Sequence, residues 1–562
     1  MKILYLTIGM LAALLCLTGC NENTEIKKTE IKNTDIKNTH ASVSQKNSSL
    51  NSQAKPLNVL YIMTDDHAAH AVGAYEGRFS KLNPTPNIDK LANEGILFSN
   101  AFVTNSICTP SRASILTGQY SQTNGVLDLR GHIATENQHL PTLMSKAGYQ
   151  TAIIGKWHLK KEPGAFDYYQ VLEGQGSYFD PTFRVQGDKK WPKNEVSYKG
   201  HSSDVVTDLS IEWLKNKTSD KPFFLMHQFK APHDMFEYAP RYEDYLAAEM
   251  VPEPTDLYGV KATFGSIATR GKNDELIKHI GTSVSKRHNR RSMGIDLGVD
   301  PSLPDEEFTR QAYQKYIKAY LRCVKGVDDN IARLLKTLKD IGEYDNTIII
   351  YTSDQGMMLG EHDFQDKRWM YEESIRMPFI VKDPRMNTHG LKNDLLINNT
   401  DFAPLILDLV GAEVPKYMHG KSFALTVLEN KTPDNWRTAS YYRYWTHRAY
   451  HDVPAHFGLR TKDYKLIFFY GANFMEKAFP FYDRKWVEKT RLSNSGINTP
   501  VAWELYDLRN DPTEQNNVYN DPKNTTLIAE LKTELKRQRE LYNETDKNYA
   551  HLQAIIDKHW ND

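Results

Sequence analysis

Acidic side chains follow two apolar runs of the sequence, at the points where those runs end. A pair of aspartates follows the run LNVLYIM, and an Asp-Gln pair follows the run NTIIIYTS. In an open α/β sheet, ligands gather beyond the carboxyl ends of the strands. One such Asp alone would be read as a helix cap or turn residue, but two clusters favour a site for a hard divalent cation such as calcium, which accepts oxygen ligands in irregular geometry. The candidate ligands are Asp65, Asp66, Asp354 and Gln355.

Basic side chains follow further apolar runs. Lys156 and His158 stand in GKWH after the run TAII, and because alternate residues of an extended chain share a face, they point the same way. His233 ends the motif APH after another run, and Lys367 comes shortly after the second acidic cluster. Each residue alone would be an ordinary surface group. Cations gathered beside a metal imply a strongly anionic substrate, either a phosphate or a sulfate.

A cysteine stands four residues before an arginine in SICTPSRASILTG. If a helix begins near Pro110, Arg112 lies beside Cys108. A helix N-terminus and a guanidinium would normally lower the pKa of the thiol. A thiolate nucleophile usually has a histidine base, however, and a hard cation prefers oxygen to sulfur. Cys108 is therefore mismatched to its surroundings.

The elements that must position these groups alternate along the chain. Apolar runs rich in Ile, Val and Phe alternate with amphipathic helical patterns, which predicts a mainly parallel sheet covered by helices on both faces. Residues 234–303 show little periodicity and are expected to form an insertion of loops. The predicted strands are residues 57–63, 150–155, 222–229 and 346–353, and the predicted helices are residues 87–96, 111–119, 140–149, 202–217 and 305–341.

The pattern changes after about residue 436. Residues 456–470 predict a β-hairpin with its turn at Lys462 and Asp463, residues 502–512 a strand and a turn, and residues 525–557 a charged helix. We therefore expect a catalytic domain at 56–435 and a smaller antiparallel α+β domain at 436–562.

The first twenty residues predict a targeting segment. MKILYLTIGMLAALLCLTGC has a basic start and an apolar run too short for a membrane span, and it resembles a bacterial lipoprotein signal with cleavage before Cys20 and lipid on that thiol. An ordinary secretory signal is the alternative. Residues 1–19 would be the signal, and the polar residues 20–55 a flexible tether behind the lipid. The expected location is the cell envelope, in the periplasm or on the outer-membrane surface, with the lipid as membrane anchor.

Composition and cysteine count narrow the class of protein. The chain has 562 residues, 25% of them charged, with a formal net charge of zero, which is untypical of a nucleic-acid binder. Cys16 would leave with the signal and Cys20 would carry lipid, so the folded part keeps Cys108 and Cys323. No disulfide framework is expected, and Cys323, in a helical pattern, is expected to be a buried apolar residue.

The stretch CTPSRASILTG resembles the signature of the type I sulfatases, whose cysteine is oxidised to formylglycine (3-oxoalanine) by a maturation enzyme. The remaining motifs follow in the order typical of that family, over roughly residues 55–520. The resemblance implies an alkaline-phosphatase-like α/β fold with a smaller C-terminal domain, a calcium ion, and hydrolysis of sulfate esters.

The resemblance also implies roles around the nucleophile. Cys108, as hydrated formylglycine, would attack sulfur, with Asp354 placed to assist its deprotonation and Arg112 to stabilise the hydrate. His158 would help the second hydroxyl of the hydrate to expel sulfate. The family's fourth metal ligand is Asn or His in some members and is Gln355 here, and all three residue types can bind a metal. The calcium ligands would be Asp65, Asp66, Asp354, Gln355 and the converted Cys108.

On the substrate side, Lys156 and Lys367 would bind sulfate oxygens, and His233 would protonate the departing sugar oxygen. A sulfatase outside the cytoplasm is expected to act on a sulfated polysaccharide or its oligosaccharides, while the sugar and the sulfate position stay open. The segment YYRYWTHRAYHDVPAHFGLR resembles a C-terminal segment of bacterial glycan sulfatases, although it would equally suit a hairpin packed at the domain junction. The candidate sugar-binding residues are His227, His362, Arg443, His447 and Arg460.

Two other functions compete with this one. A phosphate or phosphonate monoester hydrolase can use the same scaffold, in some cases with formylglycine. A glycan-binding lipoprotein without catalysis is the second alternative. Every expected catalytic position is filled in this sequence, which argues against the second alternative.

Overall fold

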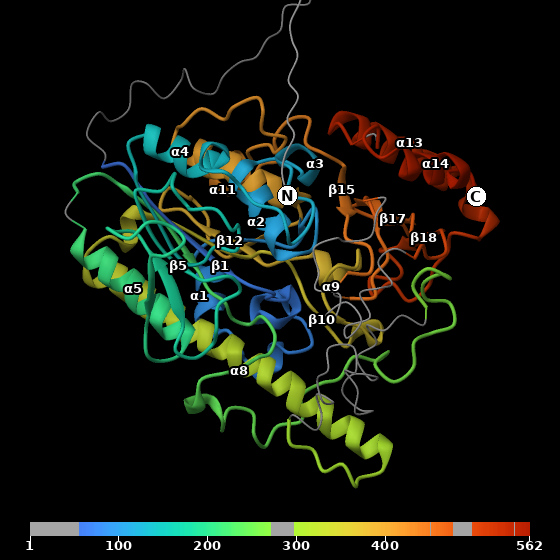
Figure 1. Cartoon of the computed structure of the whole chain (residues 1–562), viewed down its shortest axis with the longest axis horizontal. Coiled ribbons are helices and arrows are strands. Elements are labelled where there is room, and N and C mark those ends of the chain that lie inside the picture. Colours follow the sequence, from blue (N-terminus) through green and yellow to red (C-terminus); the bar gives the residue numbers. More distant parts are fainter. Residues whose placement is uncertain (1–54, 218, 271–296, 450, 476–496, 545) are drawn as a thin grey trace, which may run out of the picture. The chain divides into compact units, whose positions relative to one another are not determined.

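The structure is a computed structural model that describes residues 55–562 except 218, 271–296, 450, 476–496 and 545 (Figure 1). The predicted signal, the predicted lipid attachment at Cys20 and nearly all of the predicted tether lie outside the described residues. Residues 55–562 form one compact unit, so the predicted domain boundary near residue 436 stays a prediction. In this unit, no described helix combines the length and apolar character that crossing a membrane requires.

A ten-stranded sheet forms the centre of the unit (Figure 1). Strands β9, β1, β8, β4 and β5 run parallel to one another, and β12 pairs antiparallel with β9. The strands, in spatial order, are β13 (Leu391–Asn393), β2 (Ile96–Phe98), β12 (Phe379–Lys382), β9 (Thr347–Ser353), β1 (Asn58–Thr64), β8 (Phe223–Gln228), β4 (Gln150–Lys156), β5 (Tyr168–Leu172), β6 (Thr182–Val185) and β7 (Glu195–Ser197). The four strands predicted from sequence are confirmed as β1, β4, β8 and β9.

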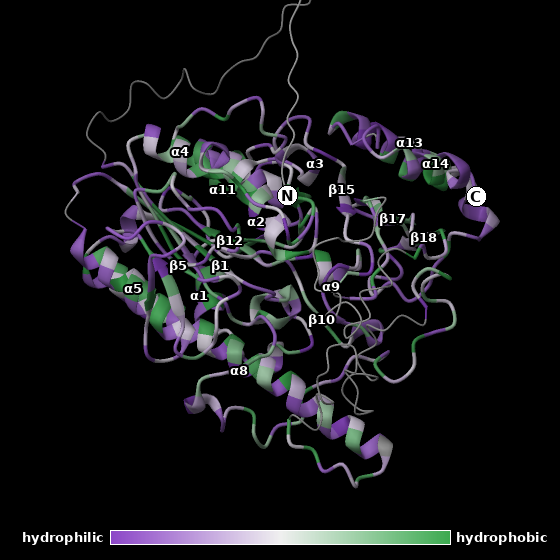
Figure 2. Ribbon diagram, viewed as in Figure 1, coloured by the Kyte–Doolittle hydropathy of each residue, from purple (hydrophilic) through white to green (hydrophobic). Residues whose placement is uncertain are grey.

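The central strands are apolar on both faces because helices cover both. Val59 and Tyr61 of β1 belong to one apolar core, whereas Leu60 and Ile62 belong to the other. The first core contains residues of α2 (Cys108–Thr117), α4 (His139–Lys146) and α10 (Phe402–Leu409). The second contains residues of α1 (Pro86–Asn93), α5 (Ser202–Asn216) and α8 (Asp305–Asp340). Figure 2 shows hydrophobic and hydrophilic residues interspersed along α8. The predicted parallel sheet with helices on both faces is confirmed.

Three of the predicted helices have different boundaries in the structure, and one of them, α4, ends at Lys146 rather than at residue 149. Helix α1 ends at Asn93, and Ile96 begins β2, because Gly95 passes so close to the backbone of Val381 that a Cβ atom would lie 2.2 Å from its oxygen. Helix α2 begins at Cys108 rather than near Pro110. The described parts of the predicted insertion, 234–270 and 297–303, contain no strand and one short 3₁₀ turn, Pro240–Tyr242.

The C-terminal region contains a four-stranded antiparallel sheet. Its strands are β15 (Ala439–Tyr444), β16 (His456–Thr461), β17 (Tyr464–Phe469) and β18 (Ala502–Asp507). The predicted hairpin is confirmed as β16 and β17. The single predicted helix over 525–557 is wrong, since two helices form there, α13 (Thr525–Leu541) and α14 (Ala550–His559). The segment between them carries Glu544 and Asp546, whose carboxylates pair with Arg443 of β15.

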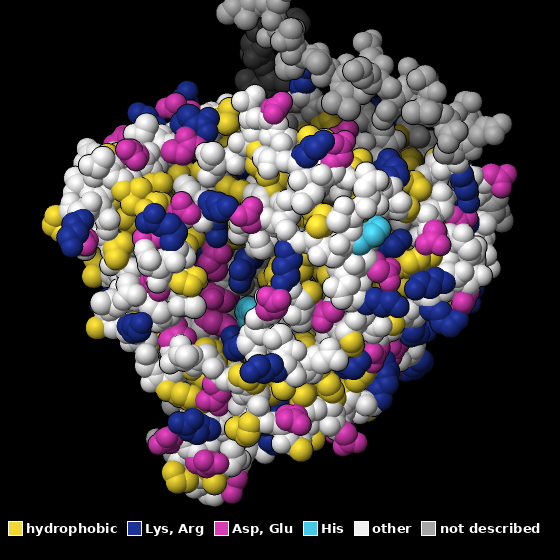
Figure 3. Space-filling view, turned by 180° about the vertical axis from the view of Figure 1, so that it is seen from behind, with side chains coloured by type: hydrophobic (Ala, Val, Ile, Leu, Met, Phe, Trp, Pro, Cys, Tyr) yellow, Lys and Arg dark blue, Asp and Glu magenta, His cyan; other side chains and the backbone are white. Residues whose placement is uncertain are grey.

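Charge is mixed over the surface. On the face shown in Figure 3, basic and acidic side chains are interspersed with hydrophobic ones. This mixture accords with the zero net charge of the chain.

A glycine in β4 gives a first prediction. Gly155 has a φ of 107°, and a Cβ atom there would lie 1.8 Å from the backbone oxygen of Gln228 in β8. We expect Gly155→Ala to lower the free energy of unfolding by about 3 kcal/mol, through overlap and backbone strain together. Gly148 also has a positive φ, 92°, but a Cβ atom there would meet no other atom within 4 Å beyond its chain neighbours, so Gly148→Ala should cost about 1 kcal/mol. Urea denaturation measures both, and equal losses would contradict the steric argument.

Candidate active site

The carboxyl ends of β1 and β9 lie side by side. Thr64 and Ser353 are paired in the parallel ladder, so the acidic residues that follow each strand become neighbours. The backbone N–H of Asp66 donates to Oδ1 of Asp354 at 3.2 Å, and the backbone N–H of Asp354 donates to the oxygen of Thr64 at 3.2 Å. Two segments nearly three hundred residues apart thus form one acidic edge of the sheet, which consists of Asp65, Asp66 and Asp354.

Three carboxylates and one amide converge at this edge. Asp65, Asp66 and Asp354 are all buried, and each offers an oxygen within 4.8 Å of the others. The amide nitrogen of Gln355 donates to Oδ1 of Asp66, whereas its Oε1 is buried and has no hydrogen-bond partner among the described residues. This free amide oxygen and the three carboxylates together offer only oxygen atoms as metal ligands. Such a set of ligands fits calcium. These four residues could hold such an ion.

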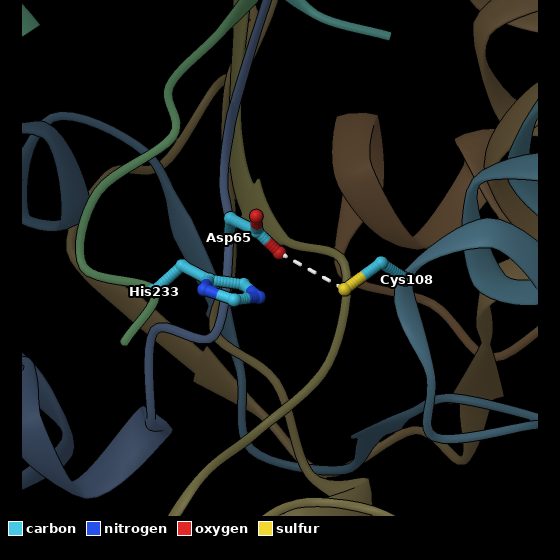
Figure 4. Close-up of side chains that lie close together, drawn as sticks. All are labelled: Asp65, Cys108 and His233. Atoms are coloured by element: carbon cyan, nitrogen blue, oxygen red, sulfur yellow. Dashed lines mark hydrogen bonds between the residues drawn. The ribbon is translucent and has the colours of Figure 1, made fainter. Parts of the chain in front are cut away.

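Cys108 faces the acidic edge from the first turn of α2. Its Sγ donates to Oδ1 of Asp65 at 3.3 Å, the residue is 1% exposed, and His233 lies on the other side of that carboxylate (Figure 4). Burial raises the pKa of the Cys108 thiol to about 12, although Lys367 and Arg112 oppose the shift. The expectation that the helix end and Arg112 lower this pKa is wrong, because the loss of solvation outweighs both effects on the encoded thiol.

Arg112 joins the elements around the cysteine. Its Nε and Nη2 lie 2.9 and 2.8 Å from Oδ2 of Asp354. Its Nη1 donates to the backbone oxygen of Lys156 and to Oε1 of Gln228, each at 2.8 Å. One guanidinium therefore connects α2 to the ends of β4, β8 and β9.

Two lysines pair with the two aspartates that follow β1. The Nζ of Lys156 bonds the carboxylate of Asp65 and, at 2.7 Å, Oε1 of Gln175. The Nζ of Lys367 lies 2.5 Å from Oδ2 of Asp66. Burial and neighbouring cations hold the pKa of Lys156 well below its usual range. Burial also opposes the charge of Lys367, but Asp366 and Asp66 together raise the pKa of Lys367 well above its usual range.

Two histidines flank the same cluster. The Nδ1 of His233 lies 2.6 Å from Oδ1 of Asp234 and its Nε2 lies 3.7 Å from Oδ2 of Asp66, so the ring is oriented toward the acidic edge. His158 is half-buried, and its backbone oxygen accepts a bond from Thr109 of α2 at 3.1 Å. The pKa values of both histidines are lowered, first by burial and then by the charges of nearby lysines.

The structure does not bring the five candidate sugar-binding residues to this cluster. The side chain of His227 points to the opposite face of the sheet, where Nδ1 bonds Ser210 of α5 at 2.8 Å. Arg443 is 1% exposed and pairs with Glu544 and, at 2.9 Å, with Asp546. This arginine therefore lies in the packing of the C-terminal sheet.

The other three are also buried among partners. Both ring nitrogens of His447 lie within bonding distance of backbone atoms. Arg460 pairs with Glu372 at 3.2 Å, and Nδ1 of His362 lies 3.1 Å from Asp256. These contacts support the alternative in which the segment packs at the junction.

Several residues of the site were not predicted from sequence. Lys230 and Asp234 flank the motif APH and could have been noticed from that position. Gln175 and Gln228 carried no signal, because their roles depend on contacts with Lys156 and Arg112 that only the fold creates.

The fold and the cluster define an alkaline-phosphatase-like hydrolase, and comparison with known families identifies which one. The sulfatase family model matches residues 57–412, and a second model, N-sulphoglucosamine sulphohydrolase, C-terminal, matches residues 360–491 and 496–541. The chain belongs to the sulfatase family. It is a sulfuric ester hydrolase, and the expected alkaline-phosphatase-like fold with a C-terminal antiparallel sheet is confirmed.

Individual relatives agree with this assignment. The N-acetylglucosamine-6-O-sulfatase of Bacteroides thetaiotaomicron is 37% identical over 533 residues, covering 88% of this chain and 87% of the relative. The N-acetylglucosamine-6-sulfatase of Homo sapiens is 28% identical over 404 residues, covering 68% and 66%. A solved structure with its substrate D-glucosamine-2-N,6-O-disulfate has 35% identity and a TM-score of 0.74, covering 88% of this chain and 99% of that one.

The raised pKa of Cys108 gives a second prediction. In protein whose Cys108 is an unmodified thiol, alkylation by iodoacetamide at about pH 8.5 should be on the order of 10³-fold slower than for a free cysteine, because a pKa of about 12 leaves little thiolate and the sulfur is buried. Peptide mass spectrometry measures the rate. The same protein in denaturant should react at the ordinary rate, and an ordinary rate in the folded protein would contradict the burial of Sγ.

Proposed function

We propose that this sulfatase removes sulfate esters from sulfated oligosaccharides of a glycosaminoglycan, with formylglycine at position 108 and calcium, and releases inorganic sulfate. The names of two relatives specify the 6-sulfate of N-acetylglucosamine, and a solved relative has D-glucosamine-2-N,6-O-disulfate as its substrate. A 6-O-sulfated glucosamine unit is accordingly the substrate we favour.

One observation carries the proposal. The cysteine of the family signature lies against Asp65, within a ring of carboxylates and lysines built from the ends of β1, β4, β8 and β9. The buried thiol, with its pKa of about 12, is poorly suited to act as a thiolate there. An oxygen at the same position suits both a hard cation and attack on sulfur.

The first group of residues would bind calcium and the sulfate group. Asp65, Asp66, Asp354 and Gln355 would hold calcium, which neutralises charge on sulfate oxygens, while formylglycine supplies the oxygen nucleophile. Lys156 and Lys367 would bind the sulfate oxygens.

The remaining residues would position groups and move protons. Arg112 would fix residue 108 and Asp354 relative to each other, and Asp354 would accept the proton of the nucleophile. Nε2 of His233 would donate a proton to the departing sugar oxygen, with its ring fixed by Asp234 at Nδ1. His158 would assist release of sulfate.

The location of the protein is part of the same proposal. The lipoprotein-like signal supports attachment through lipid on Cys20 in the cell envelope, where sulfated polysaccharide is accessible. A maturation enzyme would convert Cys108.

The test of the function compares substrates and variants. We expect hydrolysis of an aryl sulfate and of glucosamine 6-O-sulfate, with kcat/KM for the matching aryl phosphate at least roughly 100-fold lower, as expected of a member of the sulfatase family. Cys108→Ala should lose activity by at least roughly 10³-fold, since no nucleophile remains. Cys323→Ala, at a buried cysteine of α8, is the matched control and should keep its activity.

Peptide mass spectrometry of the active protein checks the modification. Conversion lowers the mass of the peptide that contains residue 108 by about 18 Da. A preference for the phosphate ester would instead favour a phosphate or phosphonate monoester hydrolase, and full activity of Cys108→Ala would exclude the proposed nucleophile.

Calcium binding gives a separate prediction that does not depend on activity. Calcium at about 100 times its Kd should raise the free energy of unfolding by about 2.7 kcal/mol. Gln355→Leu removes the unpartnered Oε1 and should weaken calcium binding by at least roughly 10-fold, measured by calorimetry and thermal denaturation. Gln186→Leu, at an exposed position, is the control. The absence of any calcium effect on the wild-type protein would contradict the proposed ligand set.

A further inference from the structure

Lys230 is a buried lysine of the site that differs from the other two. It lies just beyond the end of β8, in the segment that leads to His233, and it is 6% exposed. Lys156 and Lys367 each pair with an aspartate carboxylate. Over the part of the chain that the structure describes, the Lys230 ammonium has no hydrogen bond or ion pair, and its one ring contact places it 4.8 Å from the centre of Tyr178.

The surroundings of Lys230 place it among the reacting groups. Burial lowers its pKa, and the charges of Asp234 and Asp66 act on it from nearby in the opposite direction. Its own charge in turn lowers the pKa of Lys156. The ammonium therefore lies within the field of the acidic edge without bonding any carboxylate in it.

One short segment after β5 contacts both lysines on this side of the site. Gln175 accepts a bond from Nζ of Lys156 at 2.7 Å. Three residues further on, the hydroxyl of Tyr178 donates to the backbone oxygen of His233, while its ring faces Lys230. The position of Lys230 is thus fixed together with that of His233.

Lys230 is largely buried, and a contact with a ring only weakly replaces the hydration that its side chain has lost. Such a group is explained when a ligand supplies the missing acceptor. In a sulfuric ester hydrolase, the acceptor available at this point is an oxygen of a sulfate group, and ammonium–oxyanion hydrogen bonds are among the stronger ones.

We infer that Lys230 binds a sulfate oxygen of the substrate, as a third lysine of the site and the one not neutralised by a carboxylate. This inference rests on the proposed function. Two sources supply the same chemistry, the sulfate that is cleaved and a second sulfate on the same saccharide. Both are oxyanions that a single ammonium can bind, and substrates that differ in sulfate number distinguish them.

The experiment compares Lys230→Met with the wild-type enzyme on three substrates: an aryl sulfate, glucosamine 6-O-sulfate and glucosamine-2-N,6-O-disulfate. Loss of one charge-assisted hydrogen bond should lower kcat/KM by roughly 10- to 100-fold. A loss on all three substrates assigns Lys230 to the cleaved sulfate, and a loss on the disulfate alone assigns it to the second sulfate. Lys336→Met, at an exposed lysine of α8, is the matched control and should change nothing.

Thermal denaturation separates binding from a structural role. Because Lys230 has no bonded partner in the described protein, Lys230→Met should keep or raise the melting temperature while activity falls. Activity within twofold of wild type on all three substrates would overturn the inference, as would a lower melting temperature accompanying the loss.

Calorimetry with inorganic sulfate tests the inference even where the proposed function fails. Should the wild-type protein hydrolyse none of the three esters, the proposed function is wrong. Weaker sulfate binding by Lys230→Met than by wild type would still support an oxyanion contact, and unchanged binding would contradict it.

Discussion

The buried guanidinium of Arg112 is the interaction on which the arrangement of the site depends. It extends from the first turns of α2 and bonds Asp354 beyond β9, the backbone of Lys156 at the end of β4, and Gln228 at the end of β8. The planar, rigid fork of an arginine permits several such contacts at once, whereas a lysine offers one flexible ammonium. A buried carboxylate left without its cation costs about 3–5 kcal/mol, so the positions of Cys108 and of the acidic edge depend on this one side chain.

Charge pairing explains the rest of the cluster. Asp65 is matched by Lys156, Asp66 by Lys367, and Asp354 by Arg112. Within the described residues, Oε1 of Gln355 is a buried acceptor without a donor, and Lys230, a largely buried lysine, bonds no carboxylate. The first is suited to a cation and the second to an anion. A calcium ion would give the Gln355 oxygen a partner, and a sulfate group would give the Lys230 ammonium one. A cation alone or an anion alone would satisfy only one of the two.

The residues that follow the central strands could be predicted from the sequence. Residues whose surroundings depend on contacts between distant parts of the chain could not. The four central strands and the acidic and basic residues that follow them were predictable, because apolar runs followed by Asp, Lys or His are local patterns, whereas the role of Cys108 came from the family resemblance. Arg443 was not predictable, since its burial depends on Glu544 and Asp546 about a hundred residues further on. The break between α13 and α14 has the same origin. Basic and aromatic density therefore does not distinguish a sugar-binding surface from a buried ion-pair network.

Cys108 is the member of the site whose own chemistry suits its surroundings least. Its thiol is buried, its pKa is about 12, and it donates to a carboxylate that also belongs to the oxygen-rich set. Lowering that pKa would require solvent or additional positive charge, and the neighbouring carboxylates act against it. An oxygen in place of the sulfur would remove the difficulty, because under the proposed function it would both bind a hard cation and attack sulfur. The surroundings of residue 108 therefore support the proposed conversion of the encoded cysteine to formylglycine.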